Sequence, residues 1–402
     1  MPHSRTIDVL KEHILIDGFH VVVDHRRSIG SWIVDKDSGN KYLDCYSQFA
    51  SQPLGWKNAA LIQAQNEMGS IGRVKMANSD MYSEEYAAFV QRFSEITPDF
   101  DYYFFIEGGA LGVENALKAA FDWKAKKLGY THTIDINNLD VFHLKNAFHG
   151  RTGYTLSLTN TSPEKTALFP KFKWTTVEAD WQNIEKRMHD EVAAIIIEPI
   201  QGEGGDNHFP EEFFTNLRRI ADERASLLIF DEVQTGMGLT GKMWAYEYFN
   251  VVPDMMCFGK KTQVCGFCST KRIDEIQDNV FNTSGRINST WGGNIVDMVR
   301  FLYIIDEIEK HNLVQNSYDI GRHLLWGLRK LPIIENTRGR GLMIAFDLPS
   351  RTLRDEMFNL LSKKMLVLKC GEKSIRLRPP LTFSLEDADT AVSYIYEAIC
   401  KL

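Results

Sequence analysis

The sequence predicts an α/β protein, with a large domain built on a mainly parallel central sheet and a smaller α+β domain formed by both termini. Short apolar runs between residues 102 and 270 alternate with helical patterns, which is typical of a parallel sheet with helices on its faces. After a long helical pattern at 294–310 the chain changes to an α+β pattern. A chain of 402 residues, 44% of them apolar, is also larger than one small core requires.

The N-terminal part mixes helical and strand patterns. In order, we expect a helix near 9–13, strands near 21–23, 31–34 and 41–45, and helices at 56–69 and 84–96. Turn-forming residues at 37–40 favour a hairpin between the last two strands. Pro98 follows the second long helix and favours its end there.

The central part carries the alternation that predicts the sheet. Strand candidates are 102–106, 141–144, 154–158, 193–197, 227–230, 255–258 and 267–270, with helical patterns at 113–127 and 211–225. Such short, continuous apolar runs are typical of strands that are buried on both faces. We therefore place the large domain at residues 56–298.

The C-terminal part is α+β. After the bridging helix we expect a helix near 318–331, strands near 342–348, 366–369 and 374–377, and a final helix at 385–400. We expect residues 299–402 to pack with residues 1–55 as the small domain.

Composition excludes several classes of partner. The net charge is −7 with both signs interspersed, which argues against nucleic acid. No stretch approaches the roughly 18 to 20 apolar residues of a membrane helix, and the N-terminus lacks a signal-peptide pattern. The six cysteines are scattered, so we expect reduced thiols in a cytoplasmic enzyme. Cys265 and Cys268 form a lone CxxC, which we interpret as core packing and not as a metal site.

Asp231 and Lys260 suggest the chemistry. Asp231 directly follows the predicted strand 227–230, and Lys260 follows the predicted strand 255–258 after one glycine. Both are therefore expected at the edge of the sheet where ligands bind. Pyridoxal 5′-phosphate (PLP) needs a lysine to hold its aldehyde as an imine and a carboxylate to keep its ring nitrogen protonated. Taken singly, Asp231 could cap a turn and Lys260 could be a surface lysine.

The sequence around this pair resembles the class III (omega) aminotransferases, which have PLP-dependent transferase fold type I. Residues 231–236 read DEVQTG and match that family's D-E-V/I-Q-T-G, and Gly259 with Lys260 matches its G-K. Lys261 is the competitor, but the family's lysine directly follows the small residue, which favours Lys260. The resemblance implies that Gln234 contacts the ring hydroxyl of PLP.

A glycine-rich turn, EGGALG at residues 107–112, joins a predicted strand to a helix. Free backbone N–H groups at a helix start favour a phosphate, although such a turn is as often a tight connection. The resemblance implies that Gly109 and Ala110 hold the phosphate of PLP. The family's hydroxyl residue is absent here, which places more of this binding on backbone groups.

Residues 148–153, FHGRTG, resemble the family's aromatic-x-G-R motif. An aromatic face can stack on a pyridine ring, and an arginine can grip a carboxylate with two hydrogen bonds. Without the resemblance, Phe148 would be read as core and Arg151 as a surface charge. The resemblance implies that Phe148 stacks on PLP and that Arg151 binds a substrate carboxylate.

Residues 198–203, EPIQGE, match the family's E-P-x-Q-G-E. In that family the second acid pairs with a C-terminal arginine while the amino donor reacts, and then releases it to bind a dicarboxylate acceptor. The resemblance gives these roles to Glu203 and Arg376, which we call the gate pair. Arg378 is the alternative arginine.

Residues 288–294, NSTWGGN, resemble the family's S/T-T-x-G-G-N. There the threonine reaches the PLP phosphate of the neighbouring subunit, so Thr290 implies a homodimer with shared active sites. Asn288 is assigned to substrate binding. Without the resemblance the segment would be read as hydroxyl caps at a helix start.

Within these motifs, residues 107–110, 201–206, 259–266 and 288–291 resemble the L-lysine 6-aminotransferase branch of the family. This implies transfer of the ε-amino group of L-lysine to 2-oxoglutarate, giving 2-aminoadipate 6-semialdehyde, which cyclises, and L-glutamate. Another donor, such as ornithine, 4-aminobutyrate or a diamine, is the nearest alternative. A PLP racemase or mutase and a non-catalytic dimeric relative are further alternatives.

Overall fold

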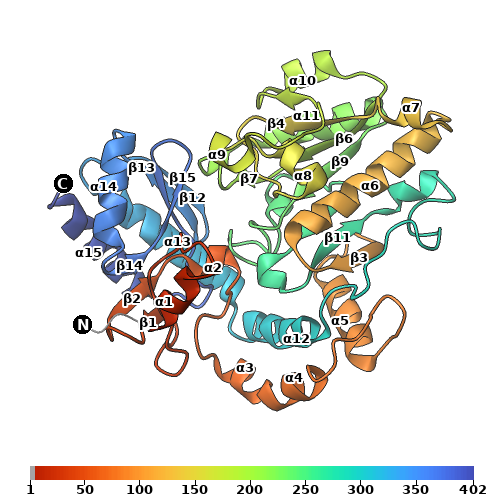
Figure 1. The fold of residues 1–402 in the computed structure, drawn as a ribbon. Coiled ribbons are helices and arrows are strands. Elements are labelled where there is room, and N and C mark those ends of the chain that lie inside the picture. The colour runs from red at the N-terminus through yellow and green to blue at the C-terminus, as the bar shows by residue number, and fades with distance from the viewer. Residues whose placement is uncertain (1–4) are drawn as a thin grey trace.

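The computed structural model describes residues 5–402, which are organised around a seven-stranded sheet (Figure 1). The strands are β3 (Tyr102–Ile106), β4 (Asp140–Leu144), β5 (Thr176–Val177), β6 (Val192–Ile197), β9 (Leu227–Asp231), β10 (Met255–Phe258) and β11 (Cys265–Ser269). Their order is β3-β11-β10-β9-β6-β4-β5. The five strands from β10 to β5 are parallel, and β11 runs antiparallel to both neighbours, which confirms the predicted mainly parallel sheet.

Helices cover both faces of this sheet, because its strands are apolar on both sides. Along β9, Leu227 and Ile229 pack into a core shared with α6 (Gly109–Lys127). Leu228 and Phe230, which point the other way, pack into a second core shared with α11 (Glu211–Glu223). The central strands are therefore buried on both faces, as their continuous apolar sequence predicts.

The two ends of the chain share a sheet. β1 (Trp32–Val34) and β2 (Lys41–Asp44) form the predicted hairpin, and β2 also pairs in parallel with β14 (Met365–Leu366). A separate four-stranded sheet contains β12 (Glu335–Arg340), β13 (Met343–Asp347), β16 (Ser374–Leu377) and β15 (Leu368–Cys370), in that order. The domain division, 56–298 against 1–55 with 299–402, stays a prediction, and its residues 1–4 lie outside the described part.

The remaining elements connect and cover these sheets (Figure 1). The helices are α1 (Arg5–Lys11), α2 (Ser47–Ala50), α3 (Ala59–Gln63), α4 (Gln65–Ile71), α5 (Glu84–Glu95), α7 (Thr133–Ile136), α8 (Gly153–Leu158), α9 (Pro163–Thr166), α10 (Trp181–Arg187), α12 (Ile295–Lys310), α13 (Leu313–Leu328), α14 (Arg351–Leu361) and α15 (Leu385–Ile399). The 3₁₀ helices are η1 (Ala245–Tyr248), η2 (Lys260–Thr262) and η3 (Lys271–Glu275), and β7 (Ile200–Gln201) pairs with β8 (Asn207–His208). None of the helices in residues 5–402 combines the length and the apolarity needed to cross a membrane.

Three sequence predictions were wrong in detail. Residues 154–158 form helix α8 and not a strand, because a capping box between Thr152 and Thr155 starts a helix at Gly153. Residues 21–23 make only an isolated bridge, Val23 with Asp35. The helix predicted at 56–69 begins at residue 59 and is split into α3 and α4. Strand β12 and helix α14 were not predicted.

Candidate active site

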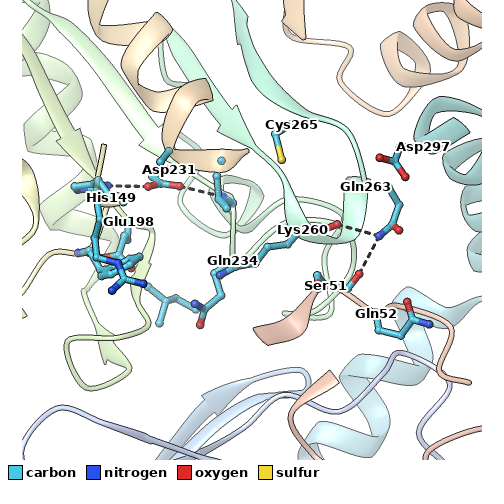
Figure 2. A pocket seen from close by; sticks show the side chains of 17 residues that line it. Ser51, Gln52, His149, Glu198, Asp231, Gln234, Lys260, Gln263, Cys265 and Asp297 are labelled. Atoms are coloured by element: carbon cyan, nitrogen blue, oxygen red, sulfur yellow. Dashed lines mark hydrogen bonds and ion pairs between the residues drawn. The ribbon is translucent and has the colours of Figure 1, made fainter. Parts of the chain in front are cut away.

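A cavity of about 610 Å³ lies at the carboxyl ends of the parallel strands, where α/β sheets commonly bind ligands (Figure 2). The chain delivers its walls from the turns that follow four of these strands and from the start of α6. Its lining includes Ser51, Gln52, Gly109, Ala110, Phe148, His149, Gly150, Arg151, Glu198, Ile200, Asp231, Val233, Gln234, Lys260, Gln263, Cys265 and Asp297.

Asp231, at the end of β9, is held in place by two donors. Its Oδ2 lies 2.7 Å from Nδ1 of His149, and its Oδ1 accepts a hydrogen bond from the backbone N–H of Val233 at 3.1 Å (Figure 2). The His149 side chain is fully buried, and its Nε2 has no hydrogen-bond partner in residues 5–402. The carboxylate of Asp231 is thus a buried, oriented acceptor in the cavity wall.

Lys260 follows β10 through Gly259 and lines the cavity. Glycine fits before it because a Cβ at position 259 would lie 3.0 Å from the Sγ of Cys265. Burial, and then the positive charge of Arg376, lowers the pKa of Lys260 to about 8. Within the described residues, the Lys260 amine makes no hydrogen bond or ion pair, so it is free to react.

Lys261, the competing lysine, lies in a different environment. Its side chain is buried, and its Nζ donates a hydrogen bond to the backbone carbonyl of Gln234 at 3.0 Å. It does not line the cavity. Adjacent residues of one 3₁₀ turn thus point to different places, and the geometry favours Lys260 as the reactive lysine.

Glu198 ties two walls of the cavity together. Its Oε1 accepts from the backbone N–H of Phe148 at 2.9 Å, and its Oε2 accepts from that of Gly202 at 3.0 Å. Burial raises the pKa of this carboxyl to about 7. Neither Glu198 nor His149 was selected from the sequence, although both stand in the quoted motifs. An acid that directly follows a buried strand, as Glu198 does, was the available signal.

The start of α6 offers donors for an anion. The backbone N–H groups of Leu111 and Gly112 bind the carbonyl of Gly108, each at 3.1 Å, whereas those of Gly109 and Ala110 have no acceptor in residues 5–402. Gly109 and Ala110 both line the cavity. A Cβ at Gly109 would lie 2.8 Å from Val233, so only glycine allows this close approach of the backbone. Free amides at the start of a 19-residue helix suit a phosphate.

The predicted gate pair is present as an ion pair. Nη2 of Arg376 lies 2.6 Å from Oε2 of Glu203. Arg376 is 3% exposed, and its Nε and Nη1 are buried without a partner in the described chain. Arg378, by contrast, bonds through every guanidinium nitrogen, to Gln234, Asp206 and two backbone carbonyls. Of these two arginines, only Arg376 has guanidinium nitrogens without a partner in the described chain, and these can bind a carboxylate.

The other predicted residues divide into two groups. Phe148, Arg151 and Gln234 line the cavity, and Arg151 is exposed. Asn288 and Thr290 are exposed and lie outside it, and the carbonyl of Thr290 accepts a hydrogen bond from the Ser79 hydroxyl at 3.1 Å. The structure therefore brings nine of the predicted residues to the cavity or to the gate pair. These nine are Gly109, Ala110, Phe148, Arg151, Glu203, Asp231, Gln234, Lys260 and Arg376.

Cys265 and Cys268 lie on strand β11, where both are buried. Within residues 5–402 no group of three or more His, Cys, Asp or Glu side chains is arranged to hold a metal ion. Within the described residues, the cavity instead combines the unpaired amine of Lys260, an oriented carboxylate, an aromatic ring and unpaired backbone amides. This set fits a phosphorylated pyridine aldehyde.

The chain is similar to known proteins along almost its whole length. The aminotransferase class-III family model matches residues 17–399. The L-lysine-epsilon aminotransferase of Mycobacterium tuberculosis is 44% identical over 98% of this chain and 95% of its own length, and that of Amycolatopsis lactamdurans is 41% identical over 100% and 97%. A solved structure of lysine aminotransferase from M. tuberculosis, in the internal aldimine form, superposes with a TM-score of 0.94, at 43% identity and 99% coverage of both chains.

Proposed function

The chain belongs to the class-III aminotransferases, a PLP-dependent family, and we propose that it transfers the ε-amino group of L-lysine to 2-oxoglutarate. The products would be 2-aminoadipate 6-semialdehyde, which cyclises to piperideine-6-carboxylate, and L-glutamate. The Glu203–Arg376 ion pair carries this proposal, because a buried arginine with spare donors, whose charge acts on the cavity residue Lys260, suits a carboxylate-bearing acceptor. The names of relatives with over 40% identity along the whole chain support lysine as the donor.

We assign the cofactor contacts to residues that line the cavity. The amides of Gly109 and Ala110 would hold the phosphate, Phe148 would stack on the ring, and Gln234 would contact the ring hydroxyl. Asp231 would hold the ring nitrogen. When bound, PLP supplies an aldehyde that condenses with amines and a protonated ring that withdraws electrons from the adjacent carbon.

Lys260 would anchor the cofactor and move the proton. Its pKa of about 8 leaves a useful fraction of the amine neutral near pH 7 to 8, so Nζ can take up a proton from the substrate carbon and return it. Asp231 stays oriented during this transfer because His149 and the Val233 amide hold both carboxylate oxygens.

The two substrates would use two different arginines. Presenting the ε-amine of lysine requires its α-carboxylate to be held away from Lys260, and Arg151, at the cavity wall, has no ion-pair partner in residues 5–402. During this stage Glu203 occupies Arg376. When 2-oxoglutarate enters, Glu203 would release Arg376 to bind its carboxylate. Asn288 is a further candidate contact for the substrate.

We also propose a homodimer with shared sites. Val74, Met81, Tyr82 and Trp291 are large apolar side chains that are exposed in the single chain. The two segments that carry them are in contact, because the Lys75 amine lies 3.6 Å from the centre of the Trp291 ring. A subunit interface here would cover this patch and bring Thr290 towards the neighbouring site. Action in the cytoplasm stays a prediction.

A panel of amino donors tests the function. Purified, PLP-loaded enzyme is given 2-oxoglutarate with L-lysine, L-ornithine, 4-aminobutyrate or a diamine, and glutamate is measured. We expect L-lysine to give the highest kcat/KM. Faster reaction with ornithine or 4-aminobutyrate would refute L-lysine as the preferred donor, and the assignment to the family would stand. Conversion of lysine to an isomer without an acceptor would instead favour the racemase or mutase alternative.

A further inference from the structure

Lys165, on the short helix α9, contacts the gate pair and was not selected from the sequence. Its Nζ forms an ion pair with Oε1 of Glu203, whereas Oε2 of the same carboxylate binds Arg376 at 2.6 Å. Glu203 is therefore shared between two cations, one on each oxygen. Lys165 Nζ also lies 5.6 Å from the centre of the Phe148 ring, so α9 reaches the cavity wall as well.

The backbone around Glu203 is held by hydrogen bonds and close packing. The carbonyl of Glu203 accepts a hydrogen bond from the Gly371 N–H at 3.0 Å, and the preceding residue, Gly202, is bound to Glu198. A Cβ at Gly371 would lie 2.9 Å from the Cα of Gly205, which shows how closely this turn packs on the loop. We therefore expect the gate to open by rotation of the Glu203 carboxylate.

The two cations differ in a way that suits a switch. Arg376 is 3% exposed and has two nitrogens without a partner among the described residues, whereas the Lys165 side chain is 31% exposed. If Arg376 were the only partner, releasing it would leave Glu203, itself 22% exposed, without a counter-charge, which is unfavourable for a partly buried carboxylate. With Lys165 already bound to the other oxygen, only one of the two contacts has to break.

We propose that Lys165 is a positioning residue of the gate, which keeps the Glu203 carboxylate paired after it has rotated off Arg376 and left Arg376 to the carboxylate of the acceptor. This role rests on the proposed function, since it requires an acceptor that carries a second carboxylate. Lys165 thereby lowers the free-energy cost of opening and improves acceptor binding. Donor binding, during which the gate stays closed, does not depend on it.

The test measures binding of glutarate, a dicarboxylate without a reactive carbonyl, to the PLP-loaded enzyme, together with KM for each substrate. We expect Lys165→Met to raise the glutarate dissociation constant and the KM for 2-oxoglutarate by about three- to tenfold, and to leave the KM for L-lysine unchanged. Lys165→Arg should restore glutarate binding. Lys364→Met breaks a half-exposed ion pair with Glu397 and serves as the charge-matched control, with no expected effect on these constants.

A double variant separates the gate from a general electrostatic effect. In a Glu203→Gln background the gate has no charge to hold, so adding Lys165→Met should change glutarate binding less than about twofold. An equal loss in both backgrounds, or no loss in either, would overturn the proposal. Thermal unfolding checks that Lys165→Met is folded, and Lys165→Gln replaces it otherwise. If the wild-type enzyme binds glutarate but does not use L-lysine, L-lysine is refuted as the donor. Glutarate binding by the variants then still tests the gate proposal.

Discussion

At the scale of single residues, the site depends on identical side chains that lie in different environments. Lys260 and Lys261 are neighbours, yet the first faces the cavity without a partner and the second is buried against the Gln234 carbonyl. Arg376 and Arg378 repeat the contrast, since within residues 5–402 only Arg376 has guanidinium nitrogens that lack a partner. Residue type and spacing identify both candidates in each pair, but burial and hydrogen bonding decide between them.

The two lysines should respond oppositely to substitution. Lys260→Ala removes the anchor and the proton carrier, so we expect loss of the visible band of bound PLP and a fall in kcat of about 10²- to 10⁴-fold or more. Lys261→Met keeps the size of the side chain and loses one buried hydrogen bond. It should retain the band and lose about 1 kcal/mol of unfolding free energy, measured with urea. A PLP band that survives in Lys260→Ala would overturn the assignment.

The pKa of Lys260 predicts how PLP loading depends on pH. The neutral amine reacts with the aldehyde, and a pKa lowered to about 8 means that this form grows as pH rises to 8 and is complete above 9. The rate at which apoenzyme captures PLP should therefore rise about fivefold from pH 7 to 8 and then level off. A simple alkylamine, with its pKa near 10, corrects for ionisation of PLP itself. An enzyme rate that still parallels the alkylamine at pH 9 would contradict this.

At the scale of elements, helices and strands that follow from their own local sequence were predictable. Elements whose conformation depends on contacts with distant residues were not. The buried strands β6, β9 and β10 follow from their continuous apolar sequence. In contrast, all four residues of α2 have positive φ, a conformation that non-glycine residues avoid. It is held by distant contacts, such as the Ser47 hydroxyl donating to the Arg378 carbonyl. No local pattern encodes that contact.

The start of α6 depends on close packing that one methyl group should disturb. A Cβ at Gly112 would lie 2.7 Å from the carbonyl oxygen of Gly266 on β11, so Gly112→Ala must push the helix away. We expect a loss of about 1–3 kcal/mol in unfolding free energy and weaker PLP binding. Gly69→Ala, in α4 with open space around the new methyl, is the matched control and should gain about 0.5–1 kcal/mol. Equal effects of the two changes on PLP affinity would argue against a phosphate site at this helix.

At the scale of the whole molecule, the site combines strand ends that one sheet holds together with residues that the chain brings from far away. The topology places Asp231 and Lys260 at one edge, which is why their spacing was informative. Lys165 comes from helix α9 and Glu203 from the turn after β7, and the sequence contains no motif that links them. Asn288 and Thr290 are exposed and lie outside the cavity of the single chain, so their roles stay predictions.

A hybrid dimer tests whether Thr290 serves the neighbouring subunit. One subunit carries Lys260→Ala and the other Thr290→Ala, each with its own affinity tag so that the mixed dimer can be purified. If Thr290 acts across the interface, one site receives both defects and the other receives none. The hybrid should then show about half the activity of the wild-type dimer and an unchanged PLP affinity. If Thr290 acts within its own subunit, the sole site with Lys260 lacks Thr290, and the hybrid should bind PLP about 10- to 100-fold more weakly, like the Thr290→Ala homodimer.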